Sequence, residues 1–134
     1  MLRGLSLAFM LALAPFAPQA HAAAPQTQEE IFLAARAAVR EGDYAKLARY
    51  HAQLQGYLLE PYVESWLLRP RLEDASVEEV RAFLSQQSGS LLAEQVRRDW
   101  LKVLGKRQRW DLFRSEYPLL VGGDNEVSCY ALQA

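Results

Sequence analysis

The chain has 134 residues, of which 15 are basic and 16 acidic, giving a net charge of −1 at pH 7. This length allows one small domain, and the balanced charge argues against a protein that binds nucleic acid. Cys129 is the only cysteine. It is therefore either a free thiol or bonded to a partner outside this chain.

The first 22 residues have the layout of a secretory signal peptide. Arg3 precedes an apolar run from Leu5 to Ala17, and Ala20-His21-Ala22 is a small-x-small cleavage motif. We expect cleavage after Ala22, with Ala24 as the second choice, which places the product in the periplasm. The apolar run is too short to span a bilayer, and no cysteine follows it to carry a lipid, so a stable membrane anchor is not expected. A buried N-terminal helix is the alternative.

Residues 23–134 form one predicted domain made of short helices. Glycines at 42, 56 and 105 are predicted to end helices, and no segment alternates with the period of a strand. Capping residues and apolar spacing predict three helices in the first half, from the Thr27 cap to Gly42, from Tyr44 to about Gln55 and from Pro61 to before Pro70. Three more are predicted from the Ser76 cap to about Gln87, from Leu91 to Leu104 and over residues 109–117. A further helix begins at Glu126.

The predicted fold class is an all-α superhelix, a solenoid of short tetratricopeptide-like helix pairs. Tyr44 and Trp110 each follow a turn and lie 66 residues apart, close to twice the ~34-residue period of such pairs. The last helix carries an apolar stripe that includes Val127 and Tyr130, and it ends without a cap. Since a solenoid needs a polar terminal cap, we expect the fold to be incomplete at its C-terminus, with Val127, Tyr130 and Leu132 exposed.

No catalytic residue, metal site or cofactor site is predicted. His51 is the only histidine after the signal segment, and nothing in the sequence brings it to Cys129. The acidic pairs Glu29-Glu30 and Glu78-Glu79 occupy the first turns of helices, where their negative charge interacts favourably with the helix dipole.

A basic cluster interleaved with Trp100 and Trp110 contains Arg97, Arg98, Lys102, Lys106, Arg107 and Arg109. We interpret it as the solvated face of the longest helix, whose C-terminal half gains from positive charge. The alternative is a surface that binds an anionic polymer.

Three segments carry a resemblance to a known family. They are Tyr57–Trp66, "YLLEPYVESW", Arg97–Phe113, "RRDWLKVLGKRQRWDLF", and Cys129–Ala134, "CYALQA". In this order the chain, from about Glu30 to Ala134, resembles the N-terminal helical domain of soluble lytic murein transglycosylases, periplasmic enzymes of Gram-negative bacteria.

The resemblance implies a ring-like superhelix of short helices with a lysozyme-like catalytic domain at the far C-terminus. Such enzymes cleave the β-1,4 bond between N-acetylmuramic acid and N-acetylglucosamine and leave a 1,6-anhydro end. They use one glutamic acid and no metal or organic cofactor. The implied partners are peptidoglycan glycan strands and the remainder of the enzyme. This chain would supply only the signal peptide and the first, non-catalytic helices.

Glu64-Ser65 matches the Glu-Ser pair at the catalytic centre of that family. The family's pair is followed by a proline-containing loop and a Gly-Leu-Met-Gln segment, which this sequence lacks. We therefore expect Glu64 and Ser65 to be structural positions at the solvent edge of a helix whose Tyr62 and Trp66 face inward, without the pocket that a general acid needs.

The resemblance also implies a disulfide between Cys129 and a cysteine further along the parent protein. The alternative is an ordinary buried thiol. A second functional interpretation is an exported helical-repeat adaptor that binds a partner protein and has no enzymatic activity.

Overall fold

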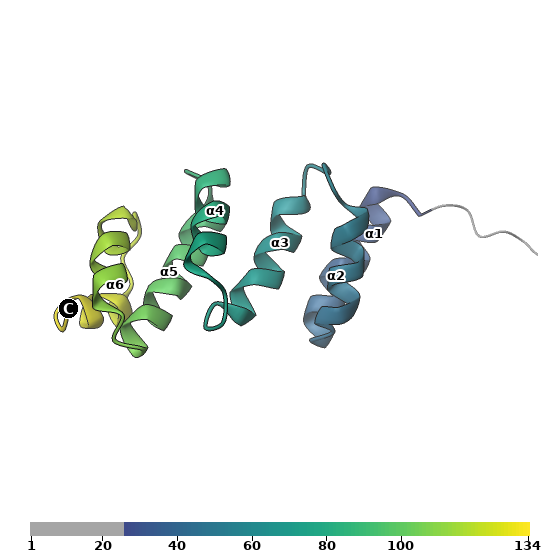
Figure 1. The fold of residues 1–134 in the computed structure, drawn as a ribbon. Coiled ribbons are helices and arrows are strands. Elements are labelled where there is room, and N and C mark those ends of the chain that lie inside the picture. Colours follow the sequence, from purple (N-terminus) through teal and green to yellow (C-terminus); the bar gives the residue numbers. More distant parts are fainter. Residues whose placement is uncertain (1–25) are drawn as a thin grey trace, which may run out of the picture.

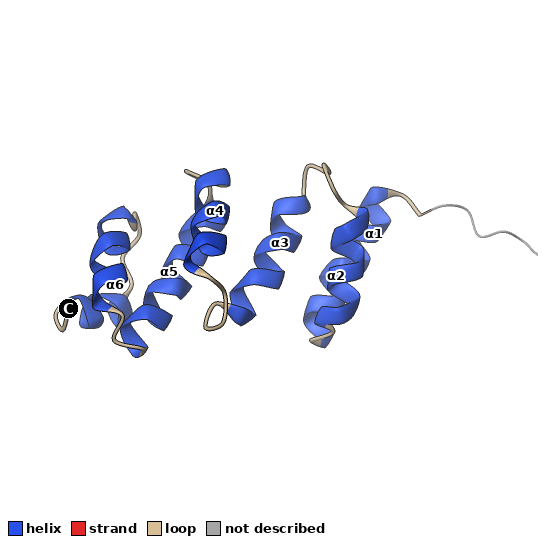
Figure 2. Ribbon diagram, in the orientation of Figure 1, coloured by secondary structure: helices blue, strands red, loops and turns tan. Residues whose placement is uncertain are grey.

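The computed structural model describes residues 26–134, so the predicted signal segment, residues 1–22, lies outside the described residues. Within the described residues helices joined by loops and turns are the only regular secondary structure, and there is no strand (Figure 2), which confirms the all-α prediction. The elements are α1 (Gln28–Glu41), α2 (Tyr44–Gln53), α3 (Glu60–Leu68), η1 (Arg69–Arg71), α4 (Val77–Gln86), α5 (Leu91–Lys106), α6 (Trp110–Glu116), η2 (Tyr117–Leu119) and α7 (Asn125–Ala131). No helix of residues 26–134 is long and apolar enough to cross a bilayer.

The helices form a row in chain order, with α1 at one end and the C-terminus at the other (Figure 1). Contacts join consecutive helices, such as α1 with α2, α2 with α3 and α5 with α6, and also helices two apart, such as α5 with α7. The buried apolar residues form two clusters. The N-terminal core consists of Ile31, Ala35, Ala38, Leu47, Leu54 and Val63. The C-terminal core consists of Leu68, Leu72, Val80, Phe83, Leu84, Ala93, Val96, Trp100, Leu101, Leu104, Phe113 and Val127. Helix α3 contributes to both.

The predicted N-terminal caps are present, with one difference. At α1, Thr27 Oγ1 accepts from the Glu30 amide at 3.2 Å, and the Glu30 carboxylate accepts from the Thr27 amide at 2.8 Å. At α4, Ser76 Oγ accepts from the Glu79 amide at 3.1 Å. The Glu79 carboxylate does not return to the cap, because it binds Arg71 instead.

The prediction that Gly105 ends the longest helix is wrong. Helix α5 continues to Lys106, and the left-handed conformation that follows it belongs to Gln108, with φ of 55°. Gly105 is buried inside the last turn, where the ring of Tyr130 from α7 packs on it. A β-carbon at this position would lie 2.3 Å from Tyr130 Cγ. The glycine is therefore needed for close approach of two helices.

Helix α3 buries more of its circumference than predicted. Ser65 is 1% exposed, although we expected it at the solvent edge, whereas Tyr62 is 44% exposed. The physical reason is that α3 contacts α1 and α2 as well as α5, so no single stripe describes its buried surface. The buried Ser65 hydroxyl is satisfied because it donates to the Tyr62 carbonyl at 2.9 Å.

Two further expectations of burial are corrected. The spacing of Tyr44, Leu47 and Ala48 predicts a buried stripe on α2, but Tyr44 and Ala48 are exposed, and Leu47 alone is fully buried there. On α7, Val127 is buried and Tyr130 is partly covered, so Leu132, at 91% exposure, is the only one of the three expected side chains that is exposed.

Candidate functional site

A cavity of about 190 Å³ lies where the N-terminal and C-terminal cores meet. Helices α2, α3 and α4 and the η1 turn each contribute to its wall. It is lined by His51, Glu64, Leu67, Leu68, Arg71, Glu79 and Phe83. We call it the Glu64 cavity, because Glu64 is its one lining carboxylate that has no partner among the described residues.

Glu64 lies in this cavity and not at an open helix edge, which corrects the sequence-based expectation. Its side chain is partly buried and makes no ion pair or hydrogen bond within residues 26–134. Burial raises the pKa of the Glu64 carboxyl above its ordinary value, and the negative charges of Glu60 and Glu79 add to that rise. His51 opposes it.

His51 closes the α2 side of the cavity. Its Nε2 atom lies 3.5 Å from Glu60 Oε1, but this atom is buried and has no hydrogen-bond partner among the described residues. The other oxygen of Glu60 accepts from the Gly56 amide at 2.6 Å. His51 therefore presents an unused nitrogen beside a carboxylate that is already held by the backbone.

Arg71 and Glu79 close the opposite side. Arg71 Nη1 donates to Glu79 Oε2 at 3.0 Å, and Nη2 donates to the other oxygen of the same carboxylate. These hydrogen bonds raise the pKa of the Arg71 guanidinium, which keeps it ionised. The positive charge of Arg71 is therefore compensated by Glu79, and Arg71 does not form an ion pair with Glu64.

The cavity does not assemble a reaction centre from the residues that line it. The Ser65 hydroxyl donates to the Tyr62 carbonyl and does not line the cavity, so none of the described residues provides a nucleophile beside Glu64. Residues 26–134 contain no group of three histidine, cysteine or acidic side chains that could hold a metal ion. What remains is a carboxyl of raised pKa next to an imidazole, an arrangement that can hold a proton or a cation.

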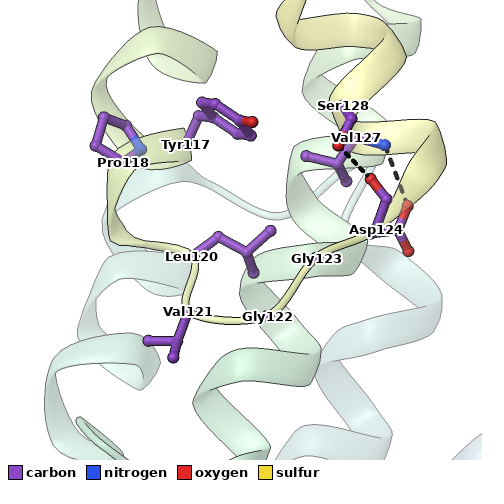
Figure 3. A pocket seen from close by; sticks show the side chains of 9 residues that line it. All are labelled: Tyr117, Pro118, Leu120, Val121, Gly122, Gly123, Asp124, Val127 and Ser128. Atoms are coloured by element: carbon purple, nitrogen blue, oxygen red, sulfur yellow. Dashed lines mark hydrogen bonds between the residues drawn. The ribbon is translucent and has the colours of Figure 1, made fainter.

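A second cavity, of about 310 Å³, lies between η2 and α7 (Figure 3). Asp124 caps α7 there, since its carboxylate accepts from the Val127 amide at 3.1 Å. Ser128 Oγ donates to the Asp124 carbonyl at 2.9 Å. Lys102 donates to the Asp124 carboxylate at 2.9 Å and holds the pKa of that carboxyl below its ordinary value. The polar groups of this cavity are therefore used by the fold itself.

A third hollow, of about 470 Å³, lies between α3 and the start of α5. Among residues 26–134, no ionisable side chain other than a tyrosine lines it, and two of its lining leucines, Leu58 and Leu91, are 87% and 72% exposed. Its lining is Leu58, Pro61, Tyr62, Trp66, Gln87, Ser90, Leu91, Leu92 and Gln95. We call it the α3–α5 groove.

The basic cluster is largely neutralised by acidic side chains of the chain itself. Arg97 Nη1 lies 2.5 Å from Glu116 Oε2. Arg98 and Lys102 lie 4.0 and 2.9 Å from Asp124 Oδ2. Lys106 and Arg107 pair with Glu73 at 3.6 and 3.0 Å, whereas Arg109 has no ion pair within the described residues. This pairing leaves little free positive charge for an anionic polymer.

Cys129 and His51 are not brought together. His51 lies on α2, near one end of the row of helices, whereas Cys129 lies on α7 at the opposite end (Figure 1). Cys129 is exposed in this chain.

We expect the Cys129 thiol of the native chain to react fully with a water-soluble disulfide reagent, because exposure and not unfolding controls its access. Spectrophotometric thiol titration before and after denaturation checks this result. A thiol that reacts only in the denatured chain would contradict the exposed position.

Comparison of the chain with protein-family models, with curated proteins and with solved structures finds no match. Its function must therefore be argued from its residues and their geometry.

Proposed function

We propose that this chain is the first part of the superhelical scaffold of a periplasmic peptidoglycan lytic transglycosylase. The observation that carries the proposal is the row of short helices in which contacts join consecutive helices, such as α1 with α2, and helices two apart, such as α3 with α5 and α5 with α7, the near-neighbour packing on which solenoids depend. The three family-like segments fall on this row in order, with Tyr57–Trp66 ending in α3, Arg97–Phe113 spanning α5 and α6, and Cys129–Ala134 in and after α7.

The role proposed for this part is structural and not catalytic. The parent enzyme would cleave the bond between N-acetylmuramic acid and N-acetylglucosamine, leave 1,6-anhydro ends and need no cofactor. Its partners would be glycan strands, with the rest of the superhelix and the catalytic domain on the same polypeptide. Export would follow from the signal segment at residues 1–22. An exposed Cys129 is accessible to a cysteine of the parent protein, as a disulfide requires.

The proposal predicts that this chain alone releases no anhydro-muropeptides from purified murein sacculi, whereas the complete gene product does. Mass spectrometry of the soluble products measures the release. The Glu64→Gln variant is the control, because Glu64 is the one carboxyl with a raised pKa in a cavity. Release by the chain alone that this substitution abolishes would make Glu64 catalytic and would overturn the structural role.

The exported adaptor is the second candidate, and the α3–α5 groove favours it. Contiguous exposed apolar side chains such as Leu58 and Leu91 are typical of surfaces that bind another protein. Sequencing the DNA beyond the codon for Ala134 separates the two candidates. A reading frame that continues to a Glu-Ser pair and a Gly-Leu-Met-Gln segment supports the transglycosylase, and a stop codon there supports the adaptor.

A further inference from the structure

We propose that the α3–α5 groove binds an uncharged, proline-rich segment of a partner protein in the extended polyproline II conformation. The prolines of that segment would pack on the rings of Tyr62 and Trp66, and its other apolar side chains would cover Leu58 and Leu91. This inference goes beyond the scaffold role and does not rest on it, because the row of helices is a scaffold whether or not the groove holds a peptide.

The charge of the groove selects an uncharged partner. Among residues 26–134, the side chains that line it include no carboxylate, no lysine, no arginine and no histidine. A charged segment that entered the groove would lose its hydration without gaining an ion pair, which is unfavourable. An uncharged segment loses nothing of this kind. The groove volume of about 470 Å³ lies within the ~300–1,000 Å³ range of ligand sites.

Two aromatic rings in the groove are held in place by a third ring outside it. Tyr62 and Trp66 lie one turn apart on α3, with ring centroids 6.3 Å apart. Phe32 of α1 packs edge-on to Tyr62 at 6.5 Å and stacks on Trp66 at 5.5 Å, and it does not line the groove. The rings are therefore ordered before a ligand binds, which lowers the entropy cost of binding. Grooves lined by aromatic side chains are the sites that proline-rich segments occupy.

Two side-chain amides of the groove are free to bond with a ligand. Gln87 and Gln95 line it, and both are partly buried. The glutamines whose side-chain amides donate a hydrogen bond within the described residues are Gln53, Gln55 and Gln133. A ligand that covers Gln87 and Gln95 must therefore supply acceptors. Otherwise each amide becomes buried and unpaired, which costs about 1–3 kcal/mol.

The exposed leucines and the free amides together select the class of ligand. Leu58 and Leu91, at 87% and 72% exposure, favour a ligand with apolar side chains, which a saccharide lacks. An amphipathic helix has such side chains, but its backbone carbonyls are bonded within the helix and would leave the amides unpaired. No strand among residues 26–134 offers an edge for pairing with an extended peptide. A polyproline II segment has apolar side chains and a backbone without internal hydrogen bonds, so it satisfies both features of the groove.

The test is a titration of the full chain with an acetylated and amidated peptide of three Leu-Pro-Pro repeats, followed by backbone amide shifts in nuclear magnetic resonance spectra. We expect a dissociation constant on the order of 100 micromolar, with shifts centred on the groove. Raising the salt concentration should leave the affinity unchanged, because none of the described charged side chains lines the groove. A Leu-Gly-Gly peptide of the same length should bind about tenfold more weakly, because its flexible backbone must be ordered on binding.

Two variants locate the peptide in the groove. Leu91→Ser should weaken binding about tenfold, and the fold should tolerate it because Leu91 is 72% exposed. Leu132→Ser is the matched control and should leave the affinity unchanged, because Leu132 is 91% exposed and does not line the groove. Gln95→Leu keeps a side chain of similar size but removes the amide, so it should also weaken binding.

Two other classes of ligand complete the test without any variant. Chitotetraose represents an uncharged saccharide, and an amphipathic leucine–glutamine peptide represents an uncharged helix. Neither should shift the amides of the groove at the concentrations at which the Leu-Pro-Pro peptide does. Tighter binding of either one than of the Leu-Pro-Pro peptide, equal effects of Leu91→Ser and Leu132→Ser, or no binding at millimolar peptide would each overturn the proposal.

Discussion

Gly105→Ala is expected to destabilise the chain by about 3 kcal/mol, the upper part of the range for overpacked sites. The new β-carbon would lie 2.3, 2.5 and 2.8 Å from Tyr130 Cγ, Cδ2 and Cβ. Because Tyr130 Cβ is fixed to the backbone, no rotation of the tyrosine removes all three clashes. Helix α7 must therefore move away from α5, and Val127, which is fully buried in the C-terminal core, moves with it.

This expectation has the opposite sign to the one from helix propensity. Alanine is favoured over glycine inside a helix by about 1 kcal/mol, so a helix that met no neighbour at this point would gain from the change. Gly123→Ala is the control, because an added β-carbon there meets nothing within 4 Å. Urea unfolding followed by circular dichroism measures both free energies. Gly105→Ala and Gly123→Ala variants of equal stability would show that Tyr130 does not pack on the glycine.

Local hydrogen bonds are the part of the fold that the sequence predicts best. The Thr27–Glu30 box and the Asp43 cap, whose carboxylate accepts from the Lys46 amide at 2.8 Å, each join residues three apart. Gly42 ends α1 with φ of 73°, as its freedom to adopt the left-handed region predicts. These features depend only on neighbours along the chain, which a sequence displays directly.

Features that depend on a distant helix could not be predicted in the same way. A glycine near a helix end has the same sequence pattern whether it stops the helix or admits a neighbour, and Gly105 does the latter because α7 crosses it. Ser65 is buried because α3 has neighbours on more than one side. The apolar residues around Ser65 in the sequence do not indicate that α3 is buried on more than one side.

The candidate site escaped prediction for the same reason. His51 and Glu64 belong to different helices separated by the turn at Gly56, and no spacing relates them. Glu79 was assigned to a cap because of its position three residues after Ser76, but an arginine from η1 competes for its carboxylate.

The basic cluster shows how ion pairing can reverse the interpretation of a charge run. Arg97 was expected on a solvated face, but its side chain is 13% exposed and its partner Glu116, which is 19 positions further on in the chain, is 6% exposed. Arg81 adds a second contact, with its Nε 2.9 Å from Glu116 Oε1. A buried carboxylate shared by two arginines ties α4, α5 and α6 together.

Glu116→Gln is expected to cost about 3 kcal/mol of stability, the lower end of the range for breaking a buried ion pair. The amide keeps one acceptor oxygen but removes the negative charge, so the mostly buried Arg97 guanidinium loses the charge that compensates it. Its Nε already lacks a hydrogen-bond partner among the described residues.

Glu126→Gln is the matched control. Its partner Lys102 lies 3.3 Å away, and Glu126 is 55% exposed, so the loss should stay below about 1 kcal/mol. Urea unfolding at low and high salt measures both. Salt should shrink the Glu126 effect and leave most of the Glu116 effect, because ions screen exposed pairs far more than buried ones. Losses of equal size, equally sensitive to salt, would place Glu116 at the surface and contradict the buried pair.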